Sequence, residues 1–214
     1  MAQDMDKVKD AYDSIAQEYA EAFSGEHDKK PKDRKMLRRF ARELGGRGPV
    51  WDLGCGPGQT AGFLRNLGVE ISGLDLSEKL LAHARAAHPG IPFQQGNILH
   101  LALESGSAAG IVSFYAIVHF TREQAQQALA EMFRVLRPGG LLLLAFHAGS
   151  ETLHITEFLG KAVEMDFMLF ESAYVSGCLK ETGFEGIEIV LREPYPGVEY
   201  PSRRAYVFAR KPGG

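Results

Sequence analysis

Apolar positions along the chain follow two spacings, one typical of helices and one typical of strands. Short apolar runs of strand length lie at 50–53, 71–75, 91–96, 110–117 and 141–146. Segments with apolar residues at helical spacing separate them, at 60–68, 78–87 and 122–136. Strands that alternate in this way with helices predict a parallel sheet covered by helices on both faces.

Both ends of the chain depart from this alternation. Residues 4–23 and 31–44 show helical spacing with one apolar face, which predicts two amphipathic helices ahead of the sheet. Near the other end, strand-like runs at 187–192 and 205–210 are joined by a short segment that contains three prolines. Such a joint is too short for a helical crossover, so these two strands should pair antiparallel. The expected fold is α/β, a Rossmann-like, seven-stranded, mostly parallel sheet that ends in an antiparallel hairpin.

Composition narrows the setting of this fold. The 214 residues suit one domain, and a formal net charge of −3 gives no overall field that would attract nucleic acid or an anionic membrane. The longest apolar run, LLLLAF at 141–146, is far shorter than a membrane helix, and the charged N-terminus lacks a signal core. Cys55 and Cys178 do not suggest a structural disulfide, so we expect a cytoplasmic, reducing setting.

The stretch VWDLGCGPGQT at 50–60 joins a strand to a helix through a glycine turn. This arrangement places backbone N–H groups at a helix N-terminus, where they face a ligand. Asp75 follows Gly58 by seventeen residues and ends the second strand. Nucleotide-binding sheets have an acid there that accepts both ribose hydroxyls. An NAD enzyme would fit these features.

Two residues argue against NAD. The dinucleotide fingerprint needs Gly or Ala where this chain has Gln59. Asp52 would also lie near a pyrophosphate, where two negative charges oppose each other in a partly buried site. For a ligand with a cationic amino acid end, the electrostatic interaction with Asp52 would be attractive instead. S-adenosylmethionine has such an end, together with a ribose for Asp75.

The chain resembles the class I S-adenosylmethionine-dependent methyltransferases, in particular the small single-domain type that includes ubiquinone-pathway and other small-molecule enzymes. The resemblance covers essentially all residues. The segments that carry it, in chain order, are VWDLGCGPGQT at 50–60, ISGLDLS at 71–77, QGNILHL at 95–101, FYAIVHF at 114–120 and LRPGGLLLL at 136–144.

This resemblance implies a cofactor site for S-adenosylmethionine. Gly54, Gly56 and Gly58 would wrap the methionine part, with Asp52 at the entrance of the loop. Asp75 would hold the ribose, Leu76 would pack on the adenine, and Asn97 and Ile98 would lie at the adenine edge. The family more often has Asp at the position of Asn97, but the Asn carbonyl can still accept from the adenine amino group.

The resemblance also implies lids over this site within a single domain spanning 1–214. YDSIAQEY at 12–19 resembles the family's lid helix, so residues 1–45 would form a cap in which Tyr12 and Tyr19 close over the cofactor. Ordinary packing of both tyrosines is the alternative. A substrate cap is expected over 148–172. It would be formed by the apolar run at 155–170, whose pocket-lining residues would be Phe158, Phe167, Met168 and Phe170, unless these residues belong to the core.

The acceptor should bind beyond the carboxyl ends of the fourth and fifth strands. Tyr115 and His119 follow the fourth strand and have either a catalytic or a structural role. After the fifth strand, His147, Glu151 and His154 would share one face if this segment formed a helix. They would then bind a metal, let Glu151 tune His147 as a base, or line a polar wall.

We therefore expect in-line methyl transfer from S-adenosylmethionine to a small molecule, with His119, His147 and Tyr115 as catalytic candidates and no metal. Arg203 or Arg204 would reach an anionic substrate unless each is exposed or ion-paired. An RNA or protein methyltransferase is the main alternative, because the basic run at 29–42 could contact phosphates. A non-catalytic cofactor-binding protein is the second alternative, and an NAD dehydrogenase ranks last. The acceptor and the oligomeric state stay open.

Overall fold

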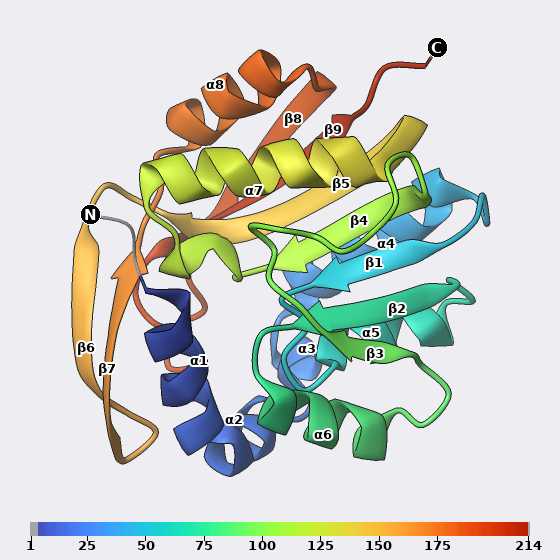
Figure 1. Ribbon diagram of the computed structural model, residues 1–214. Helices are drawn as coiled ribbons and strands as arrows, with labels where there is room; N and C mark the ends of the chain where they lie inside the picture. Colours follow the sequence, from blue (N-terminus) through green and yellow to red (C-terminus); the bar gives the residue numbers. More distant parts are fainter. Residues whose placement is uncertain (1–3, 214) are drawn as a thin grey trace.

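The computed structural model of the protein describes residues 4–213. Residues 1–3 and 214 of the expected domain lie outside the described residues. A seven-stranded sheet with the order β3-β2-β1-β4-β5-β9-β8 forms its centre (Figure 1). Its strands are β1 Val50–Leu53, β2 Ile71–Asp75, β3 Phe93–Gln95, β4 Ala108–Phe114, β5 Leu136–Ala148, β8 Glu185–Arg192 and β9 Arg203–Arg210. β1 to β5 pair in parallel, and β9 runs antiparallel to β5 and β8. The expected fold class is confirmed.

Helices cover both faces of this sheet. Those that follow or precede its strands are α4 Pro31–Leu44, α5 Gln59–Asn66, α6 Glu78–Ala87, the short 3-10 helix η1 Ile117–His119, α7 Arg122–Val135 and α8 Ser172–Thr182. β5 lies between two cores because its side chains alternate. Leu142 and Leu144 pack in the core that contains α7 and α8, whereas Leu141 and Leu143 pack in the core that contains α4 and α5.

Local sequence explains where several helices begin and end. The Ser77 side chain accepts a hydrogen bond from the N–H of Leu80 and caps α6. Thr121 and Gln124 form a capping box at the start of α7, and Gly45 ends α4 in the left-handed conformation. The caps of α6 and α7 hold loops at the carboxyl ends of β2 and β4 in place, and these loops contribute to the candidate site.

The segment after β5 is a β-hairpin, so the helix that would have brought His147, Glu151 and His154 onto one face does not form. β5 continues to Ala148, and β6 Thr152–Phe158 then pairs antiparallel with β7 Lys161–Met168. The turn between them has positive φ at Leu159 and Gly160, as a two-residue hairpin turn requires. In β6 the side chains alternate between exposed and half-buried, and this period of two, rather than a helical period, determines the structure.

The hairpin packs on the N-terminal helices, apart from the main sheet (Figure 1). These helices are α1 Met5–Ser14, α2 Ala16–Phe23 and the short α3 Glu26–Lys29. Their apolar contact with the hairpin joins residues of both, namely Ala11, Tyr12, Ile15, Tyr19, Ile155, Phe158, Val163, Met165 and Phe167. The two caps expected from the sequence therefore contact each other, although their role as lids stays a prediction.

Two further features bear on the expected setting. Cys55 and Cys178 are both buried and free of disulfides. Among the helices of residues 4–213, none combines the length and the apolar character that crossing a bilayer would require.

Candidate functional site

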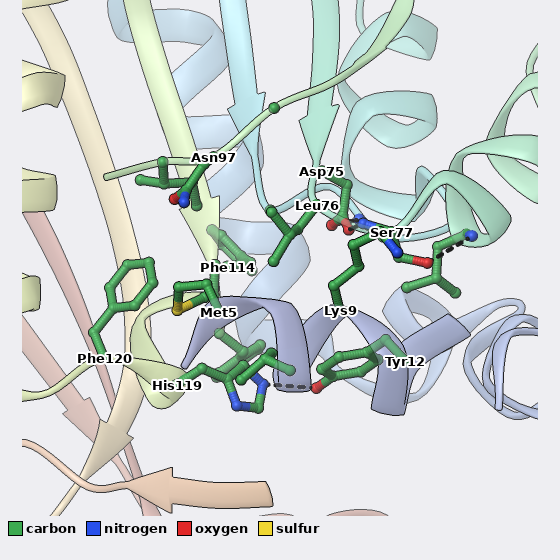
Figure 2. A pocket seen from close by; sticks show the side chains of 18 of the residues that line it. Met5, Lys9, Tyr12, Asp75, Leu76, Ser77, Asn97, Phe114, His119 and Phe120 are labelled. Atoms are coloured by element: carbon green, nitrogen blue, oxygen red, sulfur yellow. Dashed lines mark hydrogen bonds between the residues drawn. The ribbon is translucent and has the colours of Figure 1, made fainter. Parts of the chain in front are cut away.

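A cavity lies at the carboxyl ends of the parallel strands, next to α1 (Figure 2). Ten of the residues singled out from the sequence line it: Tyr12, Tyr19, Gly54, Gly56, Asp75, Leu76, Asn97, Ile98, Tyr115 and His119. They come from α1, α2, the glycine loop, β2 and the segments after β3 and β4. The structure thus gathers both the cofactor candidates and two of the three catalytic candidates around one space.

The glycine loop needs residues without side chains for two different reasons. A Cβ on Gly54 would lie 2.3 Å from the Cβ of Ala116, so a larger residue cannot be accommodated there. Gly58 has φ +86° and leads into α5, and a Cβ on it would meet Phe93 and His88 at 3.0 Å. Gly58 therefore shapes the turn and its packing, and it is not among the residues that line the cavity.

Asp75 is held at the edge of the cavity by the glycine loop itself. Its Oδ2 accepts from the N–H of Gly56 at 2.8 Å, and its Oδ1 accepts from the N–H of Ser77 at 2.9 Å. Burial raises the pKa of this carboxyl, while the backbone donors act in the opposite direction. Each oxygen retains a second lone pair, which is the arrangement needed to accept from two neighbouring hydroxyls.

Asp52 lies in a smaller polar hollow next to this cavity, and Gly54, Gly56, Tyr19 and Tyr115 line both. The side chain is buried, and its Oδ2 has no hydrogen-bond partner among residues 4–213. Burial raises the pKa of this carboxyl to about 8. An unpaired buried carboxyl is costly unless a ligand satisfies it, so the hollow suits a cationic group.

The far wall of the cavity carries Leu76, Asn97 and Ile98 (Figure 2 shows the first two). Asn97 accepts from the N–H of Leu99 at 2.9 Å through Oδ1. This contact fixes the amide orientation and occupies one of two lone pairs on its oxygen. An apolar surface next to an oriented amide matches the edge and face of a planar base.

Tyr12 and His119 connect the N-terminal cap to the floor of the cavity. The Tyr12 hydroxyl and His119 Nε2 are 2.9 Å apart (Figure 2). Burial lowers the pKa of His119 to about 4, so the imidazole is neutral near pH 7, and burial raises the pKa of Tyr12. Tyr19 packs edge-on against Tyr12 at 5.4 Å between ring centroids and also contacts Phe158 of the hairpin.

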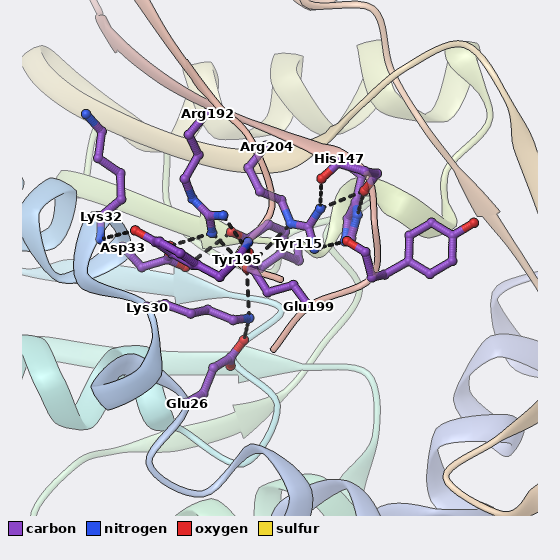
Figure 3. Close-up of polar contacts among 12 residues, drawn as sticks. Glu26, Lys30, Lys32, Asp33, Tyr115, His147, Arg192, Tyr195, Glu199 and Arg204 are labelled. Atoms are coloured by element: carbon purple, nitrogen blue, oxygen red, sulfur yellow. Dashed lines mark hydrogen bonds and ion pairs between the residues drawn. The ribbon is translucent and has the colours of Figure 1, made fainter. Parts of the chain in front are cut away.

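A buried group of charged residues lies beyond Tyr115, and we call it the charge cluster (Figure 3). It consists of Lys30, Asp33, Arg192, Glu199 and Arg204. Arg192 donates to Asp33 at 3.0 Å and pairs with Glu199, which also lies 3.4 Å from Lys30.

The cluster holds Tyr115 in an unusual conformation. The Tyr115 hydroxyl donates to Asp33 at 3.1 Å, and its φ of +59° is rare for a residue other than glycine. Its ring thereby separates the cluster from the cofactor cavity. Asp33, Arg192 and Glu199 could not be recognised as site residues from the sequence, because no short motif connects them.

The three residues expected to converge after β5 do not do so. His147 lies at the end of β5 and contacts Ser202, with 2.7 Å between Nδ1 and Oγ. His154 lies on the hairpin and pairs with Asp166 at 2.8 Å, and Glu151 is exposed. Within residues 4–213 no group of three or more His, Cys, Asp or Glu side chains is placed to bind a metal ion. The two candidate arginines differ, since Arg203 is exposed and Arg204 is buried.

The four apolar residues expected to line a substrate pocket divide into two pairs. Phe158 and Phe167 pack against the N-terminal helices, and Phe167 also lies 5.1 Å from the His119 ring. Phe170 and Met168 instead join the main core. Only the first pair is placed where it could contact a molecule next to His119.

Comparison with known proteins identifies the class. Residues 50–140 match a family described as a methyltransferase domain. A probable S-adenosylmethionine-dependent methyltransferase of Mycolicibacterium smegmatis is 38% identical over 110 residues, which cover 51% of this chain and 42% of that protein. A malonyl-[acyl-carrier protein] O-methyltransferase of Enterobacter lignolyticus is 37% identical over 109 residues, which cover 51% of this chain and 40% of that protein. The chain thus spans about two fifths of the length of these relatives.

The fold agrees over the whole chain with a solved structure. The [4+2]-cyclase SpnF superposes with a TM-score of 0.75 at 18% identity, covering 100% of this chain and 98% of that one. Residues 50–140 thus match a methyltransferase domain, and this match together with the relatives supports a class I S-adenosylmethionine-dependent methyltransferase. The expected family and its cofactor, S-adenosylmethionine, are confirmed.

Proposed function

We propose that this protein transfers a methyl group from S-adenosylmethionine to a small-molecule acceptor by in-line displacement. The observation that carries the proposal is the continuity of the main cavity, which joins Asp75 and Asn97 at one end to Tyr115 and His119 at the other. A cofactor held at the first end would present its reactive group toward the second. The cyclase neighbour shows that the fold alone does not define a reaction, so the residues must carry the argument.

The residues around the cavity fit each part of S-adenosylmethionine. The unpaired Oδ2 of buried Asp52 suits the ammonium of the methionine end, and the space at Gly54 and Gly56 suits its backbone-like atoms. Asp75 has lone pairs left for the ribose hydroxyls, and Leu76 with Asn97 suits the adenine. This fit supports nine of the ten cofactor-binding candidates. The tenth, Gly58, shapes the turn instead of lining the cavity.

When bound, this cofactor supplies an activated methyl group, so the residues of the chain mainly align the acceptor and exclude water. Such alignment can contribute up to about 7–11 kcal/mol in ideal cases. Tyr12 and His119 would close the cavity through their hydrogen bond and orient the accepting atom. Neutral His119 could also take a proton from an acceptor that must lose one.

A small acceptor agrees with the surroundings of the cavity. The N-terminal helices line one side of the cavity, and the hairpin packs against those helices. One relative is named as a methyltransferase for a malonyl group on acyl-carrier protein, which supports a small acyl acceptor. In the basic run expected for RNA binding, Lys30 is buried in the charge cluster, and Arg34 and Arg39 are ion-paired. These pairs weaken the case for a phosphate-binding face.

Isothermal titration with S-adenosylmethionine, S-adenosylhomocysteine and NADH tests the cofactor assignment. We expect micromolar binding of the first two and none of NADH. A panel of small acceptors then tests transfer, with formation of S-adenosylhomocysteine as the readout. Cofactor binding without turnover on any acceptor would favour a non-catalytic binding protein, and a steep loss of turnover with added salt would favour an RNA substrate.

A further inference from the structure

His147 lies one aromatic ring away from the cofactor cavity. Its ring centroid is 5.3 Å from that of Tyr115, and Tyr115 lines the cavity. His147 is half-buried, at the end of β5, and Figure 3 shows it beside Arg204 at one edge of the charge cluster. An acceptor molecule that extends from the cavity past the ring of Tyr115 would reach the imidazole.

The hydrogen bonds behind His147 assign its tautomer. Arg204 can only donate, and its Nη1 donates to the Oγ of Ser202 at 2.6 Å. The Ser202 hydroxyl then has one proton to place, and His147 Nδ1, at 2.7 Å, is the acceptor within reach among the described residues. The opposite assignment would leave a buried hydroxyl donor unpaired, which is unfavourable. The relay from Arg204 through Ser202 thus places the imidazole proton on Nε2.

His147 lies in a positive field. Arg204 is buried, and its hydrogen bonds go to neutral oxygens of Ser202 and Tyr200. Its nearest carboxylate is Glu199 at 3.7 Å, which is shared with Arg192 and Lys30. Burial, followed by Arg204, Lys30 and Arg192, lowers the pKa of His147 to about 3, although Glu199 acts in the opposite sense. Among the described residues, His147 Nε2 has no hydrogen-bond partner.

We propose that the His147 Nε2–H donates a hydrogen bond to a carboxylate oxygen of the acceptor and so selects anionic acceptors. The inference rests on the proposed function and deepens it by naming the substrate class. It also removes His147 from the candidates for general base, because an imidazole protonated at Nε2 and bonded at Nδ1 has no lone pair to offer the acceptor. Next to buried cations, a neutral donor binds an anionic oxygen more strongly than it binds a neutral oxygen.

Carboxylate binding tests the proposal directly. Benzoate and its uncharged counterpart benzamide are titrated into the full chain with S-adenosylhomocysteine present. We expect benzoate to bind more tightly than benzamide, and His147→Ala to weaken benzoate by about tenfold or more. His147→Gln, whose amide N–H lies near the position of Nε2–H, should keep most of that affinity. Equal binding of benzoate and benzamide to the natural chain would overturn the proposal.

His154→Ala is the matched control, because His154 is exposed and paired with Asp166 on the hairpin. It should bind benzoate as the natural chain does. A similar loss in His154→Ala and His147→Ala would show that the effect does not come from the Nε2 donor, and that result would contradict the proposal.

Nitrogen-15 NMR of the imidazole separates this inference from the proposed function. The resonance of His147 should show the proton on Nε2 near pH 7, and Ser202→Ala should shift the tautomer equilibrium. A proton on Nδ1 would overturn the inference even if the enzyme is an active methyltransferase. Failure to bind S-adenosylmethionine would overturn the proposed function, whereas the tautomer can be measured on the free protein, without the cofactor or its product.

Discussion

The proposed cofactor end of the cavity and the charge cluster beyond Tyr115 are built in different ways. At the proposed cofactor end, Gly54, Gly56 and Asp75 lie within 22 residues of each other, and backbone N–H groups position the carboxylate. In the charge cluster, Asp33 is 159 residues from Arg192 and 173 residues from Tyr206, both of which donate to it. The first region depends on a short motif and backbone geometry, and the second depends on side chains brought together by the tertiary fold.

The two regions also differ in how they relate to the matched methyltransferase domain. That domain, residues 50–140, includes Gly54, Gly56 and Asp75 but excludes Asp33, His147, Arg192 and Arg204. We expect substitutions in the charge cluster to alter stability, and those at the proposed cofactor end to alter cofactor affinity. Three substitutions test this division.

The largest expected effect is on stability, from Asp33→Ala. Asp33 is fully buried and accepts from Arg192, Tyr115 and Tyr206. Its removal leaves a buried guanidinium short of one partner and two hydroxyls without an acceptor, so the free energy of unfolding should fall by about 3–5 kcal/mol. Urea unfolding followed by circular dichroism measures this loss.

Glu188→Ala provides the matched control for this substitution. Glu188 pairs with Arg39 at 2.6 Å, but its side chain is 49% exposed, and the loss of such a surface pair changes stability by about 0–1 kcal/mol. The folded fraction of Asp33→Ala should still bind S-adenosylmethionine nearly normally, because Asp33 does not line the cofactor cavity. A large loss of cofactor affinity would show that the two regions are not independent.

The next effect is on cofactor affinity, from Asp75→Ala. Loss of two charge-assisted hydrogen bonds to the ribose should weaken S-adenosylmethionine binding by about 100-fold or more. Asp75→Asn, which keeps one carbonyl oxygen, should bind more tightly than Asp75→Ala. Calorimetric titration gives the affinities, and near-UV circular dichroism checks that the loop of Gly56 stays folded. Unchanged affinity in both variants would remove Asp75 from the cofactor site.

The same contrast explains how much of the molecule could be predicted from the sequence. The alternation of strands and helices in a mostly parallel sheet followed from apolar periodicity, and the antiparallel end followed from the prolines between 187–192 and 205–210. The hairpin was missed because a helical face was sought for His147, Glu151 and His154. The signals that favoured a hairpin were the alternation of Leu153 and Ile155 with polar neighbours and the glycine at 160.

The candidate cofactor residues could be chosen from the sequence because each belongs to a contiguous motif at the end of a strand. The charge cluster could not, since Asp33 belongs to a helix whose sequence reads as a basic amphipathic face, and Glu199 lies in a proline-rich joint. Buried ion pairs between distant segments leave no local pattern. Their existence depends on which strand ends are neighbours in the folded sheet, namely β4, β5, β9 and β8.

The smallest expected effect concerns Asp52, and it is best measured as the release of a proton when the cofactor binds. The pKa of this carboxyl is raised to about 8, so at pH 7 it is mostly protonated in the free protein. Because the pKa of Asp52 is higher in the folded state, protonation of Asp52 contributes to the stability of the fold. This contribution is complete at pH values below the unfolded pKa of 3.8 and is lost as the pH rises toward 8. An ammonium placed on Oδ2 favours the ionised form, so S-adenosylmethionine binding at pH 7 should release a proton from Asp52.

Titrations in two buffers that differ in ionisation enthalpy measure that proton release. Asp52→Asn should abolish most of it and weaken binding by about tenfold, because the ammonium loses a charged partner but keeps a carbonyl oxygen. Glu70→Gln, a change of a carboxylate outside both hollows, should leave the release unaltered. If the natural chain released no proton, Asp52 would not meet the cationic end of the cofactor. Asp52 would then have only a structural role in β1, and cofactor binding would depend on Asp75 and the loop backbone alone.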